Sequence, residues 1–297
     1  MQAVEMRARA KINIALDVLG RRPDGYHDLK TIMQSISLYD TLIIKRGDQP
    51  VELTCDLKSL PVDDTNLVYK AVLLFKELFS LSAPISVSLI KRIPVAAGLA
   101  GGSSDCAAAL LGLRKLFGGP GLPELMELGR RLGADVPFCM TGGTMLAEGI
   151  GEKLTPLPPH PPVLILVAKP PFDVKTREVF AALDLNALRP QERPDINGAI
   201  RGLRQGDLRG ITRSWGNVLE TVTVQKYPVI SEIKDIMVES GALGALMSGS
   251  GPAVAGYFTD RRTALAAMKA LRAAFPEMRE VFLTTPVRNT NGVKEVL

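Results

Sequence analysis

The chain is poor in histidine, cysteine and aromatic residues, and each shortage excludes a class of function. Its two histidines, His27 and His160, are too few for a histidine-based metal site. No GxSxG string accompanies them, which argues against a serine hydrolase. The three cysteines, Cys55, Cys106 and Cys139, are odd in number and form no CxxC pair, so neither a disulfide framework nor a zinc knuckle is expected. Acid and base chemistry must fall mainly on carboxylates and lysines.

Long apolar runs are also missing. No stretch of about 18 consecutive apolar residues occurs, and the first eleven residues contain no apolar block after a basic start, so we expect neither a membrane span nor a signal peptide. The net charge of +5 would suit nucleic acid, but the basic residues are scattered among nearly as many acidic ones and aromatic residues make up only 5%. We therefore expect a cytoplasmic protein with a weak preference for anionic ligands and no nucleic-acid or membrane partner.

The 297 residues, 46% of them hydrophobic, suffice for one large domain or two modest ones. Residues 6–18 alternate apolar and polar side chains, which predicts a strand with one polar face that carries Lys11 and Asn13. Further strands are expected at residues 31–38, 41–45 and 85–89, with an N-cap at Asp64 or Thr65 for a first helix and at Ser103 or Ser104 for a second.

Five prolines between residues 156 and 162 predict a stiff boundary, and hence an N-terminal domain at residues 1–155 and a C-terminal domain at residues 163–297. Beyond it the apolar patterns predict strands and helices in alternation. The expected strands are residues 163–168, 253–258 and a segment around Val281; the expected helices are residues 176–183, 227–240 and 262–275.

A glycine-rich segment joins a predicted strand to a predicted helix. It runs Pro94-Val95-Ala96-Ala97-Gly98-Leu99-Ala100-Gly101-Gly102-Ser103-Ser104. Glycines allow the backbone to approach a ligand, and the unpaired N–H groups at a helix start favour an anion, so this segment suits a polyphosphate. It is not a Walker loop, because no GK[ST] follows the glycines, and a flexible turn before a capped helix is the alternative.

A second glycine motif, Gly249-Ser250-Gly251, lies between two strand-like runs in the other half. Taken alone it is typical of a tight hairpin. Paired with the first segment, it would close over phosphates from the opposite side.

Together these segments resemble the GHMP family of small-molecule kinases, whose members share a lysine-containing N-terminal strand, a PxxxGLxGGSS phosphate loop and a late GSGP loop. The resemblance covers nearly the whole chain. It implies a two-domain α+β fold, with a ribosomal-protein-S5-like N-terminal domain and a ferredoxin-like α/β sandwich at the C-terminus. It also implies ATP and Mg²⁺ as cofactors.

Four strings narrow the resemblance to one branch of the family: AKIN at residues 10–13, GRRPDGYH at 20–27, GADVPF at 133–138 and AEGIGE at 147–152. This branch implies phosphorylation of the 2-hydroxyl of a cytidyl-diphosphate small molecule in isoprenoid precursor biosynthesis, with release of ADP. The chain departs from the pattern at Arg9, where proline is usual, and it has Asp105 where Asn is also common.

The resemblance also implies roles for individual residues. Asp135 would be the catalytic base, unless it merely caps the next turn, and Lys11 would stabilise charge near the acceptor hydroxyl. Residues 94–104 would bind ATP, with backbone N–H groups of Gly98, Gly101 and Gly102 and hydroxyls of Ser103 and Ser104 that donate hydrogen bonds or contact magnesium. The metal ligands stay unassigned.

For the substrate, the resemblance implies contacts from Asn13, Tyr26, His27, Phe180, Gly249, Ser250 and Gly251. Tyr26 and Phe180 would stack on the two faces of the cytosine, although Phe180 fits equally well as a core aromatic on an apolar helix stripe. We expect a monomer or a weak homodimer. The rival hypotheses are a family member acting on homoserine, mevalonate or a sugar, and a non-catalytic nucleotide- or RNA-binding protein; the latter would not need Lys11, the glycine loop and Asp135 together.

Overall fold

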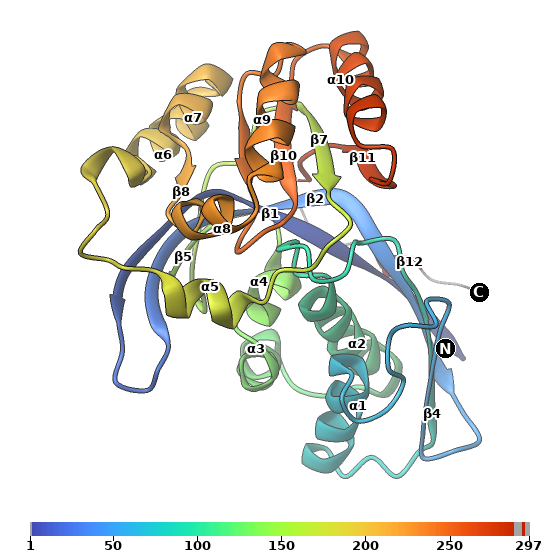
Figure 1. Ribbon diagram of the computed structural model, residues 1–297. Coiled ribbons are helices and arrows are strands. Elements are labelled where there is room, and N and C mark those ends of the chain that lie inside the picture. The colour runs from blue at the N-terminus through green and yellow to red at the C-terminus, as the bar shows by residue number, and fades with distance from the viewer. Residues whose placement is uncertain (1, 288–292, 295–297) are drawn as a thin grey trace.

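The computed structural model describes residues 2–287 and 293–294, and within them the strands form one sheet of eight and one of four (Figure 1). In the larger sheet the central order is β12-β1-β2-β4-β3, while β5 and β6 extend from β2 and β8 pairs with β1. Its strands are β1 (Ala3–Arg21), β2 (His27–Arg46), β3 (Val51–Cys55), β4 (Ile85–Ile90), β5 (Thr144–Gly149), β6 (Lys153–Pro156), β8 (Gly216–Asn217) and β12 (Val293–Lys294).

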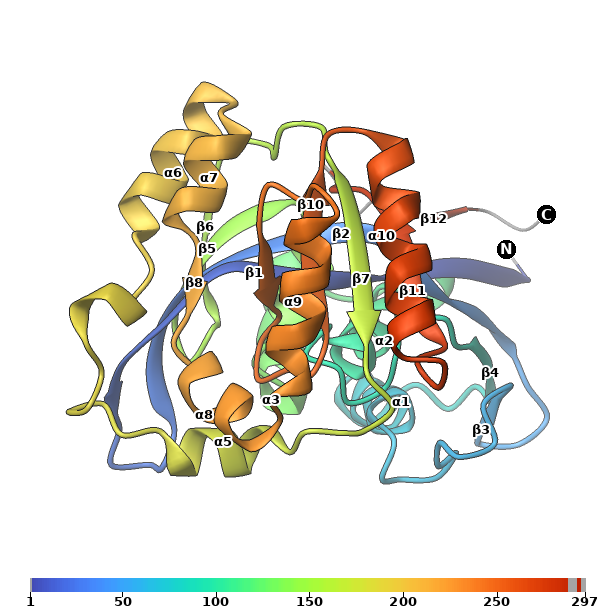
Figure 2. The same ribbon diagram turned by 45° about the horizontal axis from the view of Figure 1, so that its top comes forward.

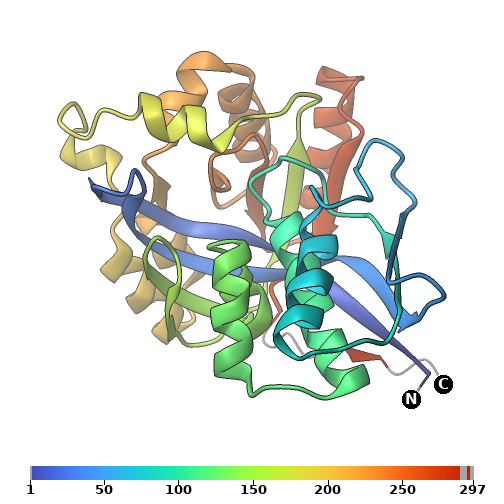
Figure 3. The ribbon, with the colours of Figure 1, turned by 90° about the horizontal axis from the view of Figure 1, so that it is seen from below.

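Four helices cover one face of this sheet, as seen from below in Figure 3. They are α1 (Leu67–Leu78), α2 (Gly101–Phe117), α3 (Leu122–Leu132) and α4 (Val136–Thr141). Helix α1 shows why they pack there: its buried residues Val68, Ala71, Val72 and Phe75 recur at helical spacing and form one apolar stripe. That stripe joins Val87 of β4 and Leu110 of α2 in one core cluster.

The second sheet lies on the opposite face of the first (Figures 1 and 2). Its order is β11-β7-β10-β9, all antiparallel, with β7 (Leu164–Lys169), β9 (Ala245–Met247), β10 (Val254–Phe258) and β11 (Glu280–Thr284). Alternate residues of β7 point to opposite faces. Ile165 and Val167 pack against Ile12 of β1, while Leu166 and Ala168 pack under α9 (Val229–Glu239) and α10 (Arg261–Ala274). This is the expected ferredoxin-like sandwich of one sheet and one helix layer.

The remaining helices connect the two sheets at one side of the molecule (Figure 2). They are α5 (Thr176–Ala182), α6 (Ile196–Gln205), α7 (Leu208–Ser214) and α8 (Glu220–Lys226), with a 3₁₀ turn at Pro190–Glu192. None of the helices in the part of the chain that the structure describes is long and apolar enough to cross a membrane.

Strand β1 differs from the expectation of one polar face. Lys11 is only 5% exposed and Asn13 only 4%, because the helices cover one side of the strand and the second sheet covers the other. Irregularities in its pairing with β2, between Arg9 and Lys11 and between Asn13 and Ala15, also interrupt the simple alternation. The polar residues of β1 are therefore buried inside the protein.

Two further local expectations are corrected. Residues 31–38 and 41–45 belong to one continuous strand, β2. The cap of α1 is Asn66, whose side chain accepts a hydrogen bond from the Val68 N–H, whereas Asp63 accepts bonds from the predicted cap Thr65.

Helix α2 begins at Gly101, so Ser103 and Ser104 lie inside its first turn and do not cap it. The cap position is Ala100, which has left-handed backbone angles. The helix ends at Phe117 before Gly118, as expected, and the predicted strands and helices of the C-terminal half are confirmed to within about two residues at their ends.

Candidate active site

The glycine-rich segment between β4 and α2 forms a folded loop with an unusual backbone. Ala96, Gly98 and Ala100 all have positive φ angles, of 50°, 78° and 57°. Left-handed residues at alternate positions turn neighbouring N–H groups toward one side, which creates a concavity that favours an anion. Two of the three are alanines, for which this conformation carries strain, and such strain persists where the surrounding structure enforces it.

The surrounding structure contacts the loop from both halves of the chain. The Lys11 N–H of β1 donates to the Leu99 carbonyl at 3.0 Å, and the Ala253 N–H donates to the Ala97 carbonyl at 3.2 Å. The Ser248 hydroxyl donates to the Gly98 carbonyl, also at 3.0 Å. The structure thus brings the two glycine-rich segments into direct contact.

Gly98 is required at this contact. A Cβ placed on it would lie 2.0 Å from the Ser248 carbonyl oxygen, far inside van der Waals contact. Gly249 lies on the other side of the same junction, where its added Cβ would be 3.2 Å from the Gly98 carbonyl oxygen and 3.6 Å from Nζ of Lys11. The second motif therefore lies beside both the first glycine-rich loop and the predicted catalytic lysine.

Two side chains that the sequence analysis did not single out hold this second loop. The amide of Asn217 donates to the carbonyls of Met247 and Gly249 at 2.9 and 2.7 Å, and its oxygen accepts from the Leu219 N–H. The carboxylate of Glu220 accepts from the Met247 N–H at 2.7 Å. Asn217 sits on β8, which pairs with β1, so it joins the second loop to the first sheet.

Lys11 is the centre of a buried polar chain. Its Nζ donates to Oδ1 of Asn13 at 2.8 Å, and the Asn13 amide donates to the Thr31 hydroxyl, which donates to the Ala15 carbonyl. Nζ also lies 3.7 Å from Oδ2 of Asp135. These bonds hold the ammonium group next to the Asp135 carboxylate. The Lys11 side chain is therefore already ordered and loses little conformational entropy when a ligand binds.

Asp135 stands immediately before α4, and within the described residues its side chain makes no capping hydrogen bond to that helix. The side chain is 30% exposed, whereas that of Lys11 is 6% exposed. An added Cβ on Gly151, in the turn between β5 and β6, would lie 3.9 Å from Oδ1 of Asp135. The carboxylate is thus accessible to a ligand and faces Lys11, as its predicted role as a base requires.

The predicted substrate residues His27 and Phe180 come together although they belong to opposite halves of the chain. Their ring centroids are 5.1 Å apart at an interplanar angle of 37°. Burial and the nearby Arg21 lower the pKa of His27, so its imidazole is neutral near pH 7. Tyr26, in the turn between β1 and β2, is 58% exposed and therefore available to a ligand.

Helix α5 connects this aromatic pair to the second glycine loop. Phe180 is on α5, and the hydroxyl of Thr176, its first residue, lies 2.8 Å from the Ser250 hydroxyl. Thr176 gave no signal in the sequence, because a single threonine at a helix start is common.

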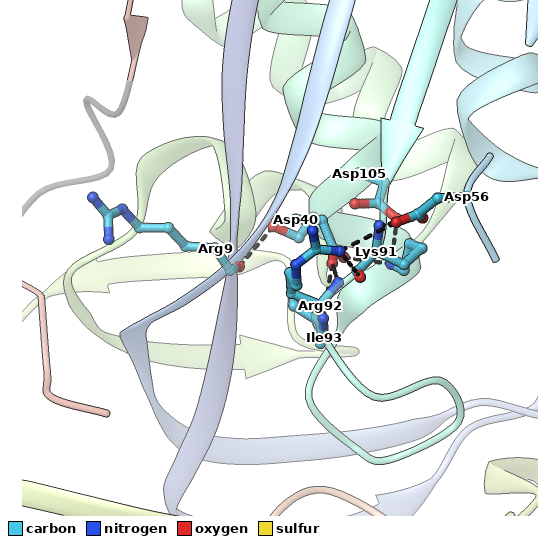
Figure 4. A network of polar contacts seen from close by, with 8 residues as sticks. Arg9, Asp40, Asp56, Lys91, Arg92, Ile93 and Asp105 are labelled. Carbon is cyan, nitrogen blue, oxygen red and sulfur yellow. Dashed lines mark hydrogen bonds and ion pairs between the residues drawn. The ribbon is translucent and has the colours of Figure 1, made fainter. Parts of the chain in front are cut away.

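A buried charge cluster lies where the phosphate loop meets β4 and α2 (Figure 4). Lys91 contacts the carboxylates of Asp40 and Asp105. Burial raises the pKa of Asp105 to about 8, against the opposing effect of the Lys91 charge. The structure thus identifies Lys91 as the partner of Asp105, which the sequence alone could not identify.

The described residues also outline a pocket of about 200 Å³ next to this cluster, where the loop starts. Its lining residues are Asp56, Leu57, Lys91, Arg92, Ile93, Val95 and Glu280. Over the same described ranges, no group of three or more His, Cys, Asp or Glu side chains is placed to hold a metal ion. The hydroxyl of Ser104 donates to the Arg9 carbonyl at 2.6 Å, which leaves Ser103 as the hydroxyl open to a ligand at this loop.

Comparison with known proteins places these features in context. A family model described as GHMP kinases N terminal domain matches residues 66–143, and a model described as GHMP kinases C terminal matches residues 199–277. A protein of Lachnospira eligens named 4-diphosphocytidyl-2-C-methyl-D-erythritol kinase is 48% identical over 286 residues, covering 96% of this chain and 98% of its own. The protein of the same name from Caldicellulosiruptor saccharolyticus is 46% identical, covering 96% and 97%.

Solved structures agree. A crystal structure of 4-(cytidine 5'-diphospho)-2C-methyl-D-erythritol kinase matches with a TM-score of 0.81 and 35% identity, covering 95% of this chain and 98% of that one. Homoserine kinase from Cytophaga hutchinsonii matches with a TM-score of 0.78 at 20% identity, covering 100% and 98%, and shares the fold.

Proposed function

The chain belongs to the GHMP kinase family, and we propose that it transfers the γ-phosphoryl group of ATP to the 2-hydroxyl of 4-diphosphocytidyl-2-C-methyl-D-erythritol, releasing ADP. This step belongs to the non-mevalonate route to isoprenoid precursors. The observation that carries the proposal is the 48% identity, over 96% of the chain, to a relative named for this activity. The geometry supports it, because a loop suited to a polyphosphate contacts Lys11, which faces Asp135. An aromatic pair suited to a pyrimidine is linked to the same region through α5, whose Thr176 contacts Ser250 of the second glycine loop.

In the proposed mechanism Asp135 accepts the proton of the acceptor hydroxyl as the oxygen attacks the γ-phosphorus in line. Lys11, held by Asn13, stabilises the negative charge that develops between the carboxylate and the phosphoryl group. Substrate and ATP must lie on either side of this pair, with the cytidine toward His27 and Phe180. A positioned base of this kind contributes about 10²–10⁴-fold to the rate.

ATP would place its phosphates in the concavity of residues 94–104, with Gly98, Gly101 and Gly102 contributing backbone N–H groups. Mg²⁺ would enter with the nucleotide, because this ion is usually held by substrate phosphates and one or two protein oxygens, and it neutralises phosphate charge. Ser103 is the hydroxyl of the loop that would contact the ion, since the Ser104 hydroxyl is engaged with the Arg9 carbonyl. We propose the pocket lined by Asp56, Leu57 and Arg92 for the adenine.

The substrate would contact Asn13, Tyr26, His27, Phe180, Gly249, Ser250 and Gly251. We also propose a boundary at residues 156–162 between an N-terminal domain, residues 1–155, and a C-terminal domain, residues 163–297. The protein would be cytoplasmic and monomeric or weakly dimeric, without nucleic-acid or membrane partners. The basic residues are scattered among nearly as many acidic ones, which is consistent with a small-molecule enzyme.

The test is ADP release by purified protein with ATP, Mg²⁺ and the cytidyl-diphosphate alcohol, in parallel with mevalonate and homoserine. Turnover restricted to the cytidyl substrate supports the assignment, whereas turnover with another alcohol alone rejects this substrate and leaves a kinase of the same family. Asp135→Asn preserves shape and removes the base, so we expect kcat to fall by about 10²–10⁴-fold. Asp173→Asn, on an exposed carboxylate outside the site, is the matched control.

A further inference from the structure

Lys91 makes two buried hydrogen bonds to carboxyl groups from the chain segment that leads into the phosphate loop (Figure 4). Its Nζ donates to Oδ2 of Asp105 at 2.7 Å and to Oδ2 of Asp40. Lys91, directly after β4, is 6% exposed; Asp105 of α2 is 4% exposed and Asp40 of β2 is 0% exposed. One ammonium therefore joins three elements in the interior.

The two carboxyl groups that Lys91 contacts lie at opposite ends of the phosphate loop. At its start, Oδ1 of Asp40 accepts from the backbone N–H groups of Arg92 and Ile93, immediately before Pro94. At its end, Asp105 follows Ser104 and lies just after the first turn of α2. A Cβ added to Gly101 would lie 3.4 Å from Nζ of Lys91, so the ammonium also lies against the loop backbone.

Stability alone is a weak reason for such a cluster. Burying charges costs desolvation free energy that their attraction often fails to recover, and Oδ1 of Asp105 is buried without a hydrogen-bond partner among the described residues. The loop, however, carries two alanines with positive φ, a conformation that relaxes unless both ends are held. A loop already held in its binding shape loses less conformational entropy when a ligand binds.

We propose that Lys91 is a positioning residue for the nucleotide: by bridging Asp40 and Asp105 it holds the two ends of the phosphate loop together in the conformation that receives the phosphates. This inference rests on the proposed function, in that residues 94–104 receive ATP. The Lys91 side chain acts through the loop and not by contact with the reacting atoms.

The experiment measures the dissociation constant of ATP by calorimetry in the absence of the acceptor alcohol, together with the thermal midpoint of each variant. Asp105→Ala removes the contact at the end of the loop and leaves Lys91 paired with Asp40, so no unpaired charge is created. We expect ATP binding to weaken by about tenfold, the effect of one charge-assisted hydrogen bond. Asp105→Asn keeps an oxygen acceptor for Nζ and should bind ATP within about twofold of the parent.

The matched control is Asp173→Ala. Another buried lysine, Lys169, is paired with the carboxylates of Asp173 and Glu280, and this substitution removes one of the two. It should lower stability slightly and leave ATP binding unchanged. If Asp105→Ala fails to fold, Asp105→Leu, which keeps the branched shape of the side chain and leaves Lys91 paired with Asp40, removes the same contact and should bind ATP about tenfold more weakly.

Unchanged ATP affinity in a folded Asp105→Ala protein, or equal losses in Asp105→Ala and Asp105→Asn, would overturn the inference. Loss of thermal stability without loss of affinity would do the same, because it would show a purely structural role. A parent protein that binds ATP but does not phosphorylate the cytidyl substrate would instead reject the substrate assignment and leave this inference standing. A parent that binds no ATP would reject the proposed function and, with it, the premise of this inference.

Discussion

His27 and Phe180 lie with their ring centroids 5.1 Å apart, and they join the hairpin of β1 and β2 to helix α5. The two rings are tilted at 37°, and Tyr26, which precedes His27 in the chain, is exposed. Aromatic surfaces of this kind bind nucleobases by stacking, and a neutral imidazole adds a hydrogen-bond donor or acceptor. We therefore propose that the cytosine of the substrate binds at this pair.

Replacing Phe180 should test whether the cytosine binds at this pair. Phe180→Ala removes about 1–3 kcal/mol of stacking, so KM for the cytidyl substrate should rise roughly tenfold to a hundredfold while KM for ATP stays constant. Steady-state kinetics with each substrate varied in turn provides the measurement. Phe172→Ala is the control, since Phe172 is a partly buried aromatic of the same half that stacks on Tyr227. Equal changes in the two KM values would contradict a specific role for Phe180.

Gly98→Ala should separate the two glycine-rich segments. The added methyl group would meet the Ser248 carbonyl oxygen at 2.0 Å, so the loops must move apart and ATP turnover should fall by at least about tenfold. Gly206→Ala, just after α6 and outside the site, also adds a methyl group at a left-handed position, with a φ of +66° against +78°, but no described atom lies within 4 Å of its added Cβ. Both variants lose the roughly 1–2 kcal/mol of a left-handed alanine. A Gly98→Ala enzyme as stable and as fast as Gly206→Ala would disprove the clash.

Asn217→Asp should destabilise the second glycine loop. The substitution keeps the shape but puts a carboxylate oxygen where an N–H₂ group now donates to the carbonyls of Met247 and Gly249. We expect a loss of at least about 1–3 kcal/mol in the free energy of unfolding, measured by urea denaturation, because two buried carbonyls lose their donor. Asn186→Asp, at an exposed turn, should change it by less than about 0.5 kcal/mol.

His160 should make the protein sensitive to acid. Burial lowers its pKa from the ordinary 6.5 to about 4, so between these values the unfolded chain binds a proton that the folded chain does not. Stability therefore falls as the pH drops from about 6.5 to 4, by up to about 3 kcal/mol from this group. His160→Gln should reduce the change of the unfolding free energy with pH over that range, whereas His27→Gln should leave most of this change in place. An unaltered slope in His160→Gln would mean that other groups cause the acid loss.

Much of the fold could be predicted from local patterns. The apolar stripe of α1 and the buried strands β7 and β10 each follow from the spacing of their apolar residues, and the glycine-rich segments were found from composition and order alone. The family and its two-domain α+β fold followed from the resemblance, and the comparisons confirm them. Helix starts were less predictable: Asn66, and not Asp64 or Thr65, caps α1, since Asp63 bonds to Thr65 in a competing local turn.

Local sequence thus specified which segments form strands, helices and glycine loops, because period, capping and turn chemistry depend on residues a few positions apart. Tertiary structure decided what those segments meet. It buried Lys11 between the helices and the second sheet. It also brought together residues that are far apart in the chain: Ser248 donates to the Gly98 carbonyl, Asn217 donates to the second loop, and Lys91 contacts Asp40 and Asp105. Such contacts arise only when two sheets and their helices pack, since packing alone brings distant polar groups together and removes water from around them.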